Sequence, residues 1–247
     1  MKPQFPPQRL LLTAISAISF VALLSFDSSA LAADNELTPE EKKTGWKLLF
    51  DGKTTDGWLD SKQQKVTEDH VQNGSLNPHR CNYMLIHKDI VDNFVLSLDF
   101  RISMKCNSGI FIRTFPLEPR PGKDVGFNGI EVAIDDTTTA GFHDTGAIYD
   151  LVQPAENAMK PVDEWNHMEI TCDRNLIQVS LNGRRVNNMD LDQWTVANKR
   201  PDGSDHKFDV VYKDHPRKGY IGLQDHGSDV WYRNIKLLPL EIGRAHV

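Results

Sequence analysis

The stretch that decides the fold runs from residue 94 to residue 103 and reads FVLSLDFRIS. Apolar side chains occupy every second position, beginning with Phe94 and ending with Ile102. Successive side chains of a β-strand point to opposite faces of the sheet. The stretch therefore predicts a strand with one face in a core and the other turned to water.

Runs of the same kind follow along the chain and are separated by Gly, Asn and Asp. Further strands are predicted at 110–115, 130–135, 165–173, 176–181, 184–189, 220–224 and 230–238, and turns at 107–109, 174–175, 182–183 and 227–228. No amphipathic helix of ordinary length and no strand–helix alternation appears in this part of the chain. The pattern predicts an all-β fold, an antiparallel two-sheet sandwich or jelly roll.

The first 32 residues have the features of an export signal. Lys2 and Arg9 precede a run, 10–26, that is apolar apart from Thr and Ser, and Ala30-Leu31-Ala32 provides a small–x–small cleavage pattern. An uncleaved membrane anchor is the alternative, but the run is shorter than the ~20 residues that a spanning helix needs. We predict a signal peptide at 1–32, a polar lead with a helical turn at 33–44, one domain at 45–240 and a tail at 241–247. The protein would then be periplasmic or secreted, without membrane insertion after cleavage.

The charge and cysteine content limit the classes of partner. The formal net charge is −6, which argues against nucleic acid as a partner because phosphate is neutralised by clustered Lys and Arg. Export would permit a disulfide, yet three cysteines leave at least one thiol unpaired. A Cys81–Cys106 bond is one option, and Cys172 is expected to be a buried thiol.

Strand phase gathers polar side chains on one face. Burying the isoleucines and leucines of three predicted strands turns their neighbours to the other face; these are Phe111, Arg113, Glu131, Asp135, Gln224 and His226, with Gly109, Ala133 and Gly222 leaving space. This composition is typical of a groove for a polyhydroxylated ligand. Tyr149 and Trp231 would add a stacking surface, and Asn107 a further sugar contact. The alternatives are a cross-strand ion pair for Arg113 and Glu131, a surface turn for His226, and packing beneath a loop for Phe111 and Trp231.

Three long segments, 116–127, 153–163 and 195–218, interrupt the strand pattern and are expected to be loops. Loops longer than ~12–15 residues in a compact domain usually carry function or move. Zinc, phosphate-loop and nucleophile-elbow motifs are missing from the sequence.

Several stretches of the sequence are distinctive when taken together. They are FDGKTTDGW (50–58), NSGIFIR (107–113), GIEVAIDD (129–136), the segment from GAIYD to DEWN (146–166), LNGRRV (181–186) and GYIGLQDHG with WYRNIKL (219–237). In this order they resemble the 3-keto-disaccharide hydrolase domain family. The resemblance covers residues 46–238. It implies a concanavalin A-like jelly roll, exported bacterial proteins, and cleavage of glycosides whose C3 hydroxyl has been oxidised to a ketone. One position departs from the family, which commonly has Glu-Val-Gln where this chain has Glu131-Val132-Ala133.

A C3 ketone acidifies the hydrogen on C2, so such a glycoside can break by elimination, followed by addition of water. We expect His226 to act as the base, or as the acid toward the leaving group, and Arg113 to bind the ketone or hydroxyl oxygens. Glu131 and Asp135 would hold sugar hydroxyls or a divalent cation, Ca²⁺ or Mg²⁺, and Tyr149 would donate a proton. No cofactor is otherwise expected, and the predicted partner is a keto-sugar substrate. The alternatives are a non-catalytic carbohydrate-binding module and a protein-interaction sandwich on the same fold.

Overall fold

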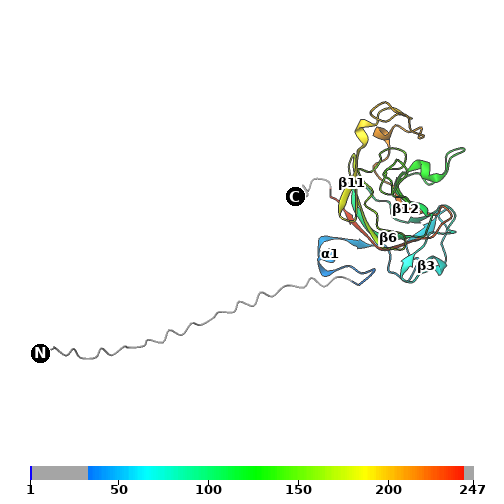
Figure 1. Cartoon of the computed structure of the whole chain (residues 1–247). Coiled ribbons are helices and arrows are strands. Elements are labelled where there is room, and N and C mark those ends of the chain that lie inside the picture. Colours follow the sequence, from blue (N-terminus) through cyan, green and yellow to red (C-terminus); the bar gives the residue numbers. More distant parts are fainter. Residues whose placement is uncertain (2–32, 242–247) are drawn as a thin grey trace. The chain divides into compact units, whose positions relative to one another are not determined.

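In the computed structural model, Met1 and residues 33–241 are described. The domain is built of two antiparallel sheets packed face to face, with β6 in one and β12 in the other (Figure 1). This confirms the predicted all-β, concanavalin A-like two-sheet jelly-roll sandwich. The predicted signal peptide lies outside the described residues, Met1 apart. Within the described part, no helix is long and apolar enough to cross a membrane.

The larger sheet has eight strands in the described part of the chain. Seven follow the order β11-β10-β9-β6-β13-β4-β3, and β1 also pairs with β13. Their bounds are β1 Lys47–Leu48, β3 Val71–Gln72, β4 Ser75–Leu76, β6 Phe94–Ile102, β9 Asn166–Asp173, β10 Leu176–Leu181, β11 Arg184–Asp190 and β13 Val230–Pro239.

The smaller sheet has five described strands in the order β2-β5-β12-β7-β8. Their bounds are β2 Trp58–Asp60, β5 Met84–His87, β7 Asn107–Thr114, β8 Ile130–Asp135 and β12 Tyr220–Gln224. Four short 3-10 helices lie in the connections, η1 Glu68–His70, η2 Val125–Asn128, η3 Leu191–Gln193 and η4 Tyr212–Asp214. The expected turn at 107–109 is wrong, because these residues begin β7 and pair with β8.

The core lies between the sheets and follows from the alternation in the sequence. Phe94, Phe100 and Ile102 of β6 are buried against Ile110 of β7 and Leu223 of β12. The intervening residues of β6 are only half-buried, as the period of two requires. All three cysteines are buried and free, so Cys81 and Cys106 form no disulfide in this structure.

A short helix and its flanks fasten the lead segment to the outer face of the larger sheet. In α1 (Pro39–Thr44), Thr38 caps the helix together with Glu41, and Gly45 ends it with a left-handed φ of 93°. Lys236 of β13 donates to both oxygens of the Glu41 carboxylate, at 2.8 and 2.9 Å. The lead is therefore part of the folded domain.

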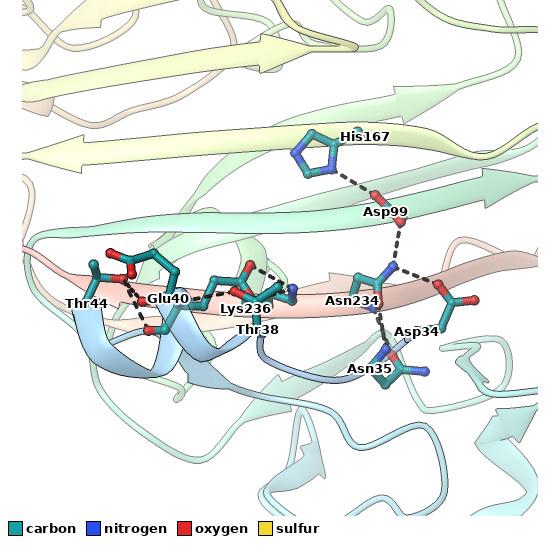
Figure 2. Close-up of polar contacts among 10 residues, drawn as sticks. Asp34, Asn35, Thr38, Glu40, Thr44, Asp99, His167, Asn234 and Lys236 are labelled. Carbon is teal, nitrogen blue, oxygen red and sulfur yellow. Dashed lines mark hydrogen bonds and ion pairs between the residues drawn. The ribbon is translucent and has the colours of Figure 1, made fainter. Parts of the chain in front are cut away.

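Nearer the start of the lead, two asparagines lock the chain to β13. The Asn35 N–H donates to Asn234 Oδ1 at 2.6 Å, and the Asn234 N–H donates to Asn35 Oδ1 at 2.9 Å. Figure 2 shows Asp99 between His167 and Asn234, where it accepts from both side chains. This polar network occupies the face of the larger sheet that points away from the core.

Candidate active site

A pocket of about 150 Å³ opens over the face of the smaller sheet that points away from the core. Strands β7, β8 and β12 form its floor, and the predicted loops 116–127 and 195–218 supply residues to its walls. In Figure 1 the loop 116–127 is green and the loop 195–218 is orange, and both lie above the label of β12. The lining residues are Tyr83, Asn107, Phe111, Asp124, Gly126, Phe127, Gly129, Glu131, Tyr149, Lys207, Phe208, Gln224 and His226.

Glu131 carries the carboxyl group on the floor of this pocket. It lies on β8 opposite Phe111 of β7, and its carbonyl oxygen accepts from the Tyr149 N–H at 2.9 Å. Burial raises the pKa of Glu131 from the ordinary 4.5 to about 8, although the charge of Lys207 acts in the opposite direction. A carboxyl group with a pKa near neutrality can both accept and donate a proton in catalysis.

Gly109 makes the room that the Glu131 side chain occupies. A Cβ atom added at Gly109 would lie 2.5 Å from Glu131 Oε1 and 2.8 Å from its Cγ, well inside van der Waals contact. The absence of a side chain at Gly109 therefore allows the Glu131 carboxyl group to occupy this position.

Replacing Gly109 with Ala is expected to displace the Glu131 carboxyl group and to lower activity about 10²-fold, because misplacing a reacting group by 1 Å has that order of cost. Gly183→Ala is the matched control for adding a methyl group, since nothing lies within 4 Å of a Cβ atom at that position. The backbone φ of 79° at Gly183 is strained for alanine, so this variant also controls for a loss of stability. Steady-state rates and thermal melts of both variants check this. A fully active Gly109→Ala protein would contradict it.

Tyr83 and Gln224 form a second polar group beside Glu131. The Gln224 side chain and the Gly126 backbone hydrogen-bond the Tyr83 hydroxyl, while burial and the nearby charges of Glu131 and Asp124 raise the pKa of Tyr83. The tyrosine thus stays neutral and able to donate. Gln224 Oε1 is buried and has no hydrogen-bond partner among the described residues, so its capacity to accept a hydrogen bond is unused.

An apolar cluster fills the rest of this sheet face. Met84, Ile86, Phe111, Leu117 and Val125 pack together, with Tyr83 and Tyr220 at their margin. Leu117 and Val125 belong to the loop 116–127, which covers the cluster. The open pocket is therefore confined to the part of the sheet that carries Glu131 and Gln224.

Six of the nine residues predicted from the sequence line this one pocket. They are Asn107, Phe111, Glu131, Tyr149, Gln224 and His226. His226 follows β12 and is exposed, whereas Tyr149 is half-buried and stacks on His143 with ring centroids 4.6 Å apart. Strand phase had grouped Phe111, Glu131, Gln224 and His226, and the role of each of the six residues remains a prediction.

The prediction that Arg113 lines the same pocket is wrong. Arg113 is fully buried and none of its guanidinium nitrogens has a hydrogen-bond partner within the described part of the chain. Its φ is 53°, and the pairing of β7 with β12 shifts register between Tyr220 and Gly222. This irregularity breaks the alternation after Ile112, so Arg113 does not share the face of Phe111.

Asp135 and Trp231 also lie outside the pocket. Asp135 has the predicted phase but is four residues beyond Glu131, about 13 Å along the strand, and its carboxylate accepts from Thr137 Oγ1 at 3.0 Å. Trp231 belongs to β13 of the other sheet, where its Nε1–H donates to Gln72 Oε1 at 3.0 Å and Arg101 stacks over its ring at 4.5 Å. The sequence pattern does not reveal which sheet a strand joins.

The pocket also contains residues that strand phase did not identify. Tyr83 precedes β5, an apolar run that shows no alternation, and Lys207 and Phe208 come from the loop 195–218. Asp124, Gly126 and Phe127 come from the loop 116–127. For the five residues that these two loops contribute, the unusual length of the loops was the only signal in the sequence.

The sequence matches the family of 3-keto-alpha-glucoside-1,2-lyase-like domains over residues 45–238. The protein belongs to this family. A curated relative, the 3-keto-disaccharide hydrolase of Bacteroides thetaiotaomicron, is 24% identical over 253 residues that span 88% of this chain and 87% of the relative.

Solved structures of similar proteins agree with membership of the 3-keto-alpha-glucoside-1,2-lyase-like family. A candidate glycosyl hydrolase of Parabacteroides distasonis has 31% identity and a TM-score of 0.65, over 79% of this chain and 99% of that one. A second candidate glycosyl hydrolase from the same organism has 23% identity and a TM-score of 0.68, over 85% of this chain and all of that one. The second supports the fold alone.

Two features of this family member bear on ligands. Ala133, which stands where the resemblance leads us to expect Gln, is buried opposite Gly109 and adds no amide to the pocket. Among the described residues, no three His, Cys, Asp or Glu side chains could jointly hold a metal ion. Because Asp135 is outside the pocket, the predicted shared cation site of Glu131 and Asp135 does not fit.

Proposed function

We propose that this protein cleaves the glycosidic bond of 3-keto glycosides, including 3-keto disaccharides, by elimination followed by hydration. The observation that carries the proposal is the place of the Glu131 carboxyl group, in the space left by Gly109 on the floor of a pocket in a member of this family, where desolvation raises its pKa to about 8.

In the first step, the ionised Glu131 removes the proton from C2 of the keto sugar. The electron pair of the C–H bond moves toward the C3 carbonyl and forms an enolate. Burial makes the Glu131 carboxylate a stronger base than an exposed one, as the raised pKa records. This assigns the base to Glu131, whereas the sequence analysis expected His226 to act as the base or as the acid toward the leaving group.

In the second step, the enolate re-forms the C3 ketone, its electron pair at C2 forms a C1=C2 double bond, and the bond between C1 and the aglycone oxygen breaks. His226, exposed at the pocket, would give a proton to the departing oxygen. Tyr83 and Gln224 would hold sugar oxygens through the neutral hydroxyl and the unpartnered Oε1. Water then adds its hydroxyl to C1 and a proton to C2, so that the net reaction is hydrolysis.

The proposed reaction differs from that of ordinary glycosidases, which use two carboxylates on either side of an oxocarbenium-like transition state. Here one base is enough, since the ketone already activates C2. If the export predicted from residues 1–32 occurs, the reaction takes place in the periplasm or outside the cell.

Replacing His226 with Ala should lower the rate of aglycone release from a 3-keto glucoside about 10²-fold, the lower range for loss of a general acid. The assay compares 3-keto-sucrose, 3-keto-trehalose and 3-keto aryl glucosides, with the release of product followed directly. The effect should be largest for the poorest leaving group, because a good leaving group departs without a proton.

Arg113→Met is the matched control. It removes a guanidinium that lies outside the pocket and keeps a side chain of similar length, so activity should be retained. If the wild-type protein binds glycans but cleaves none of the substrates, this would support a carbohydrate-binding module and contradict the proposed function.

A further inference from the structure

We infer that Lys207 is a further catalytic residue of the pocket, the cation that stabilises the enolate oxygen formed on C3 of the substrate. This inference rests on the proposed function. Lys207 thereby takes the role in binding the ketone oxygen that the sequence analysis expected of Arg113. The strand pattern of the sequence does not identify Lys207.

Lys207 is the one Lys or Arg side chain among the described residues that line the pocket. Lys207 forms no ion pair with any residue of the described part of the chain, whereas Lys199, Arg200 and Arg217 of the same loop each pair with a carboxylate. Its charge is nevertheless felt by Glu131 and opposes the effect of burial on that group. The pocket therefore places one cation, Lys207, together with two acidic residues, Glu131 and Asp124.

Three aromatic rings surround the ammonium group. Its Nζ lies 4.0 Å from the centroid of the Tyr149 ring, 5.2 Å from that of Phe208 and 5.7 Å from that of Phe127. The negative faces of aromatic rings attract an ammonium group at these distances. The three rings thus hold the Lys207 side chain at the pocket, where its positive charge can stabilise an oxyanion.

The backbone beneath Lys207 is held in place by Asp150. The Lys207 N–H donates to Asp150 Oδ2 at 2.7 Å. Arg200 in turn donates to the Asp150 carbonyl oxygen at 2.6 Å and to that of Leu151 at 3.1 Å. The loop is therefore tied to the segment that carries Tyr149, and the ammonium group is preorganised before a substrate binds.

This placement fits the charge that develops during the reaction. Removal of the C2 proton puts negative charge on the C3 oxygen, and a preorganised cation in a partly closed pocket stabilises that charge in the transition state more than in the neutral ketone. The same cation keeps part of the Glu131 population ionised, and so supports the base.

The test uses the full-length protein with a 3-keto glucoside and compares Lys207→Met, Lys207→Arg and the wild type. Lys207→Met should lower kcat about 10²–10³-fold while KM changes less than about tenfold, as expected for an interaction made in the transition state. Lys207→Arg keeps the charge and should lose about tenfold or less. Lys213→Met is the matched control, because Lys213 is an exposed lysine of the same loop outside the pocket.

Two further readouts separate this role from a structural one. Substrate deuterated at C2 should show a primary isotope effect in Lys207→Met at least as large as in the wild type. The acid limb of the pH–rate profile should move to higher pH, because loss of the cation removes the one charge that opposes the raised pKa of Glu131. Unchanged melting temperatures would confirm that the variants fold.

Unchanged kcat with a raised KM in Lys207→Met would overturn the inference and leave the proposed function intact. A borohydride-trapped adduct between the keto sugar and Lys207 would also overturn it, since the lysine would then be a nucleophile. A wild-type protein that cleaves none of the 3-keto glycosides would overturn the proposed function and this role with it.

Discussion

Replacing Glu131 with Gln is expected to lower kcat for 3-keto-glycoside cleavage by about 10³–10⁴-fold, the upper range for loss of a general base. Glutamine has nearly the same shape, so the space made by Gly109 stays filled and the pocket keeps its form. It cannot accept the C2 proton, however, at any pH in the working range. Steady-state kinetics and exchange of the C2 hydrogen in deuterated water measure the loss directly.

Glu169→Gln is the control for the change of residue type. Glu169 lies on β9 of the other sheet and faces away from the core, so its replacement should leave the rate within about twofold, as for most surface substitutions. If Glu131→Gln released the aglycone and exchanged C2 hydrogen at the wild-type rate, a different group would have to be the base.

Most of the framework could be predicted because it depends on period-two patterns. The predicted strand at 94–102 is confirmed as β6, and those at 176–181 and 220–224 as β10 and β12. The phase of β7, β8 and β12 also placed Phe111, Glu131 and Gln224 on one face. Local patterns are sufficient where a strand is regular and half-buried.

The rest depended on features that no local pattern encodes. Strand β5, with four buried residues in a row, offered no alternation and was missed. The irregularity after Ile112 turned Arg113 out of phase, and only the pairing with β12 reveals it. Lys207 reaches the pocket because its loop is tied to Asp150, which is 57 residues away in the chain.

Raising the pH should change activity and stability in opposite directions, because both depend on the same proton of Glu131. The base must be ionised, so kcat/KM should rise about tenfold per pH unit below the pKa and level off above about 8. At pH 6 the rate should therefore be about 10²-fold below its plateau. A pH–rate profile of the wild type, with a buffer control for ionic strength, checks this limb.

The unfolding free energy should follow the opposite trend. Between the ordinary pKa of 4.5 and the folded value of about 8, the folded protein holds a proton on Glu131 that the unfolded chain releases. Stability from this group is thus full below 4.5 and is lost as the pH rises through 8, a loss on the order of 5 kcal/mol. Glu131→Gln carries no such proton.

Urea melts of the wild type and Glu131→Gln at pH 5 and pH 9 therefore give a direct comparison. The variant should gain stability relative to the wild type at pH 9 by about 4 kcal/mol more than at pH 5. Equal differences at the two pH values would show that the carboxyl group is not held protonated by its surroundings. The pocket would then lack the base on which the elimination depends, because a carboxylate with an ordinary pKa is too weak to remove a C2 proton efficiently.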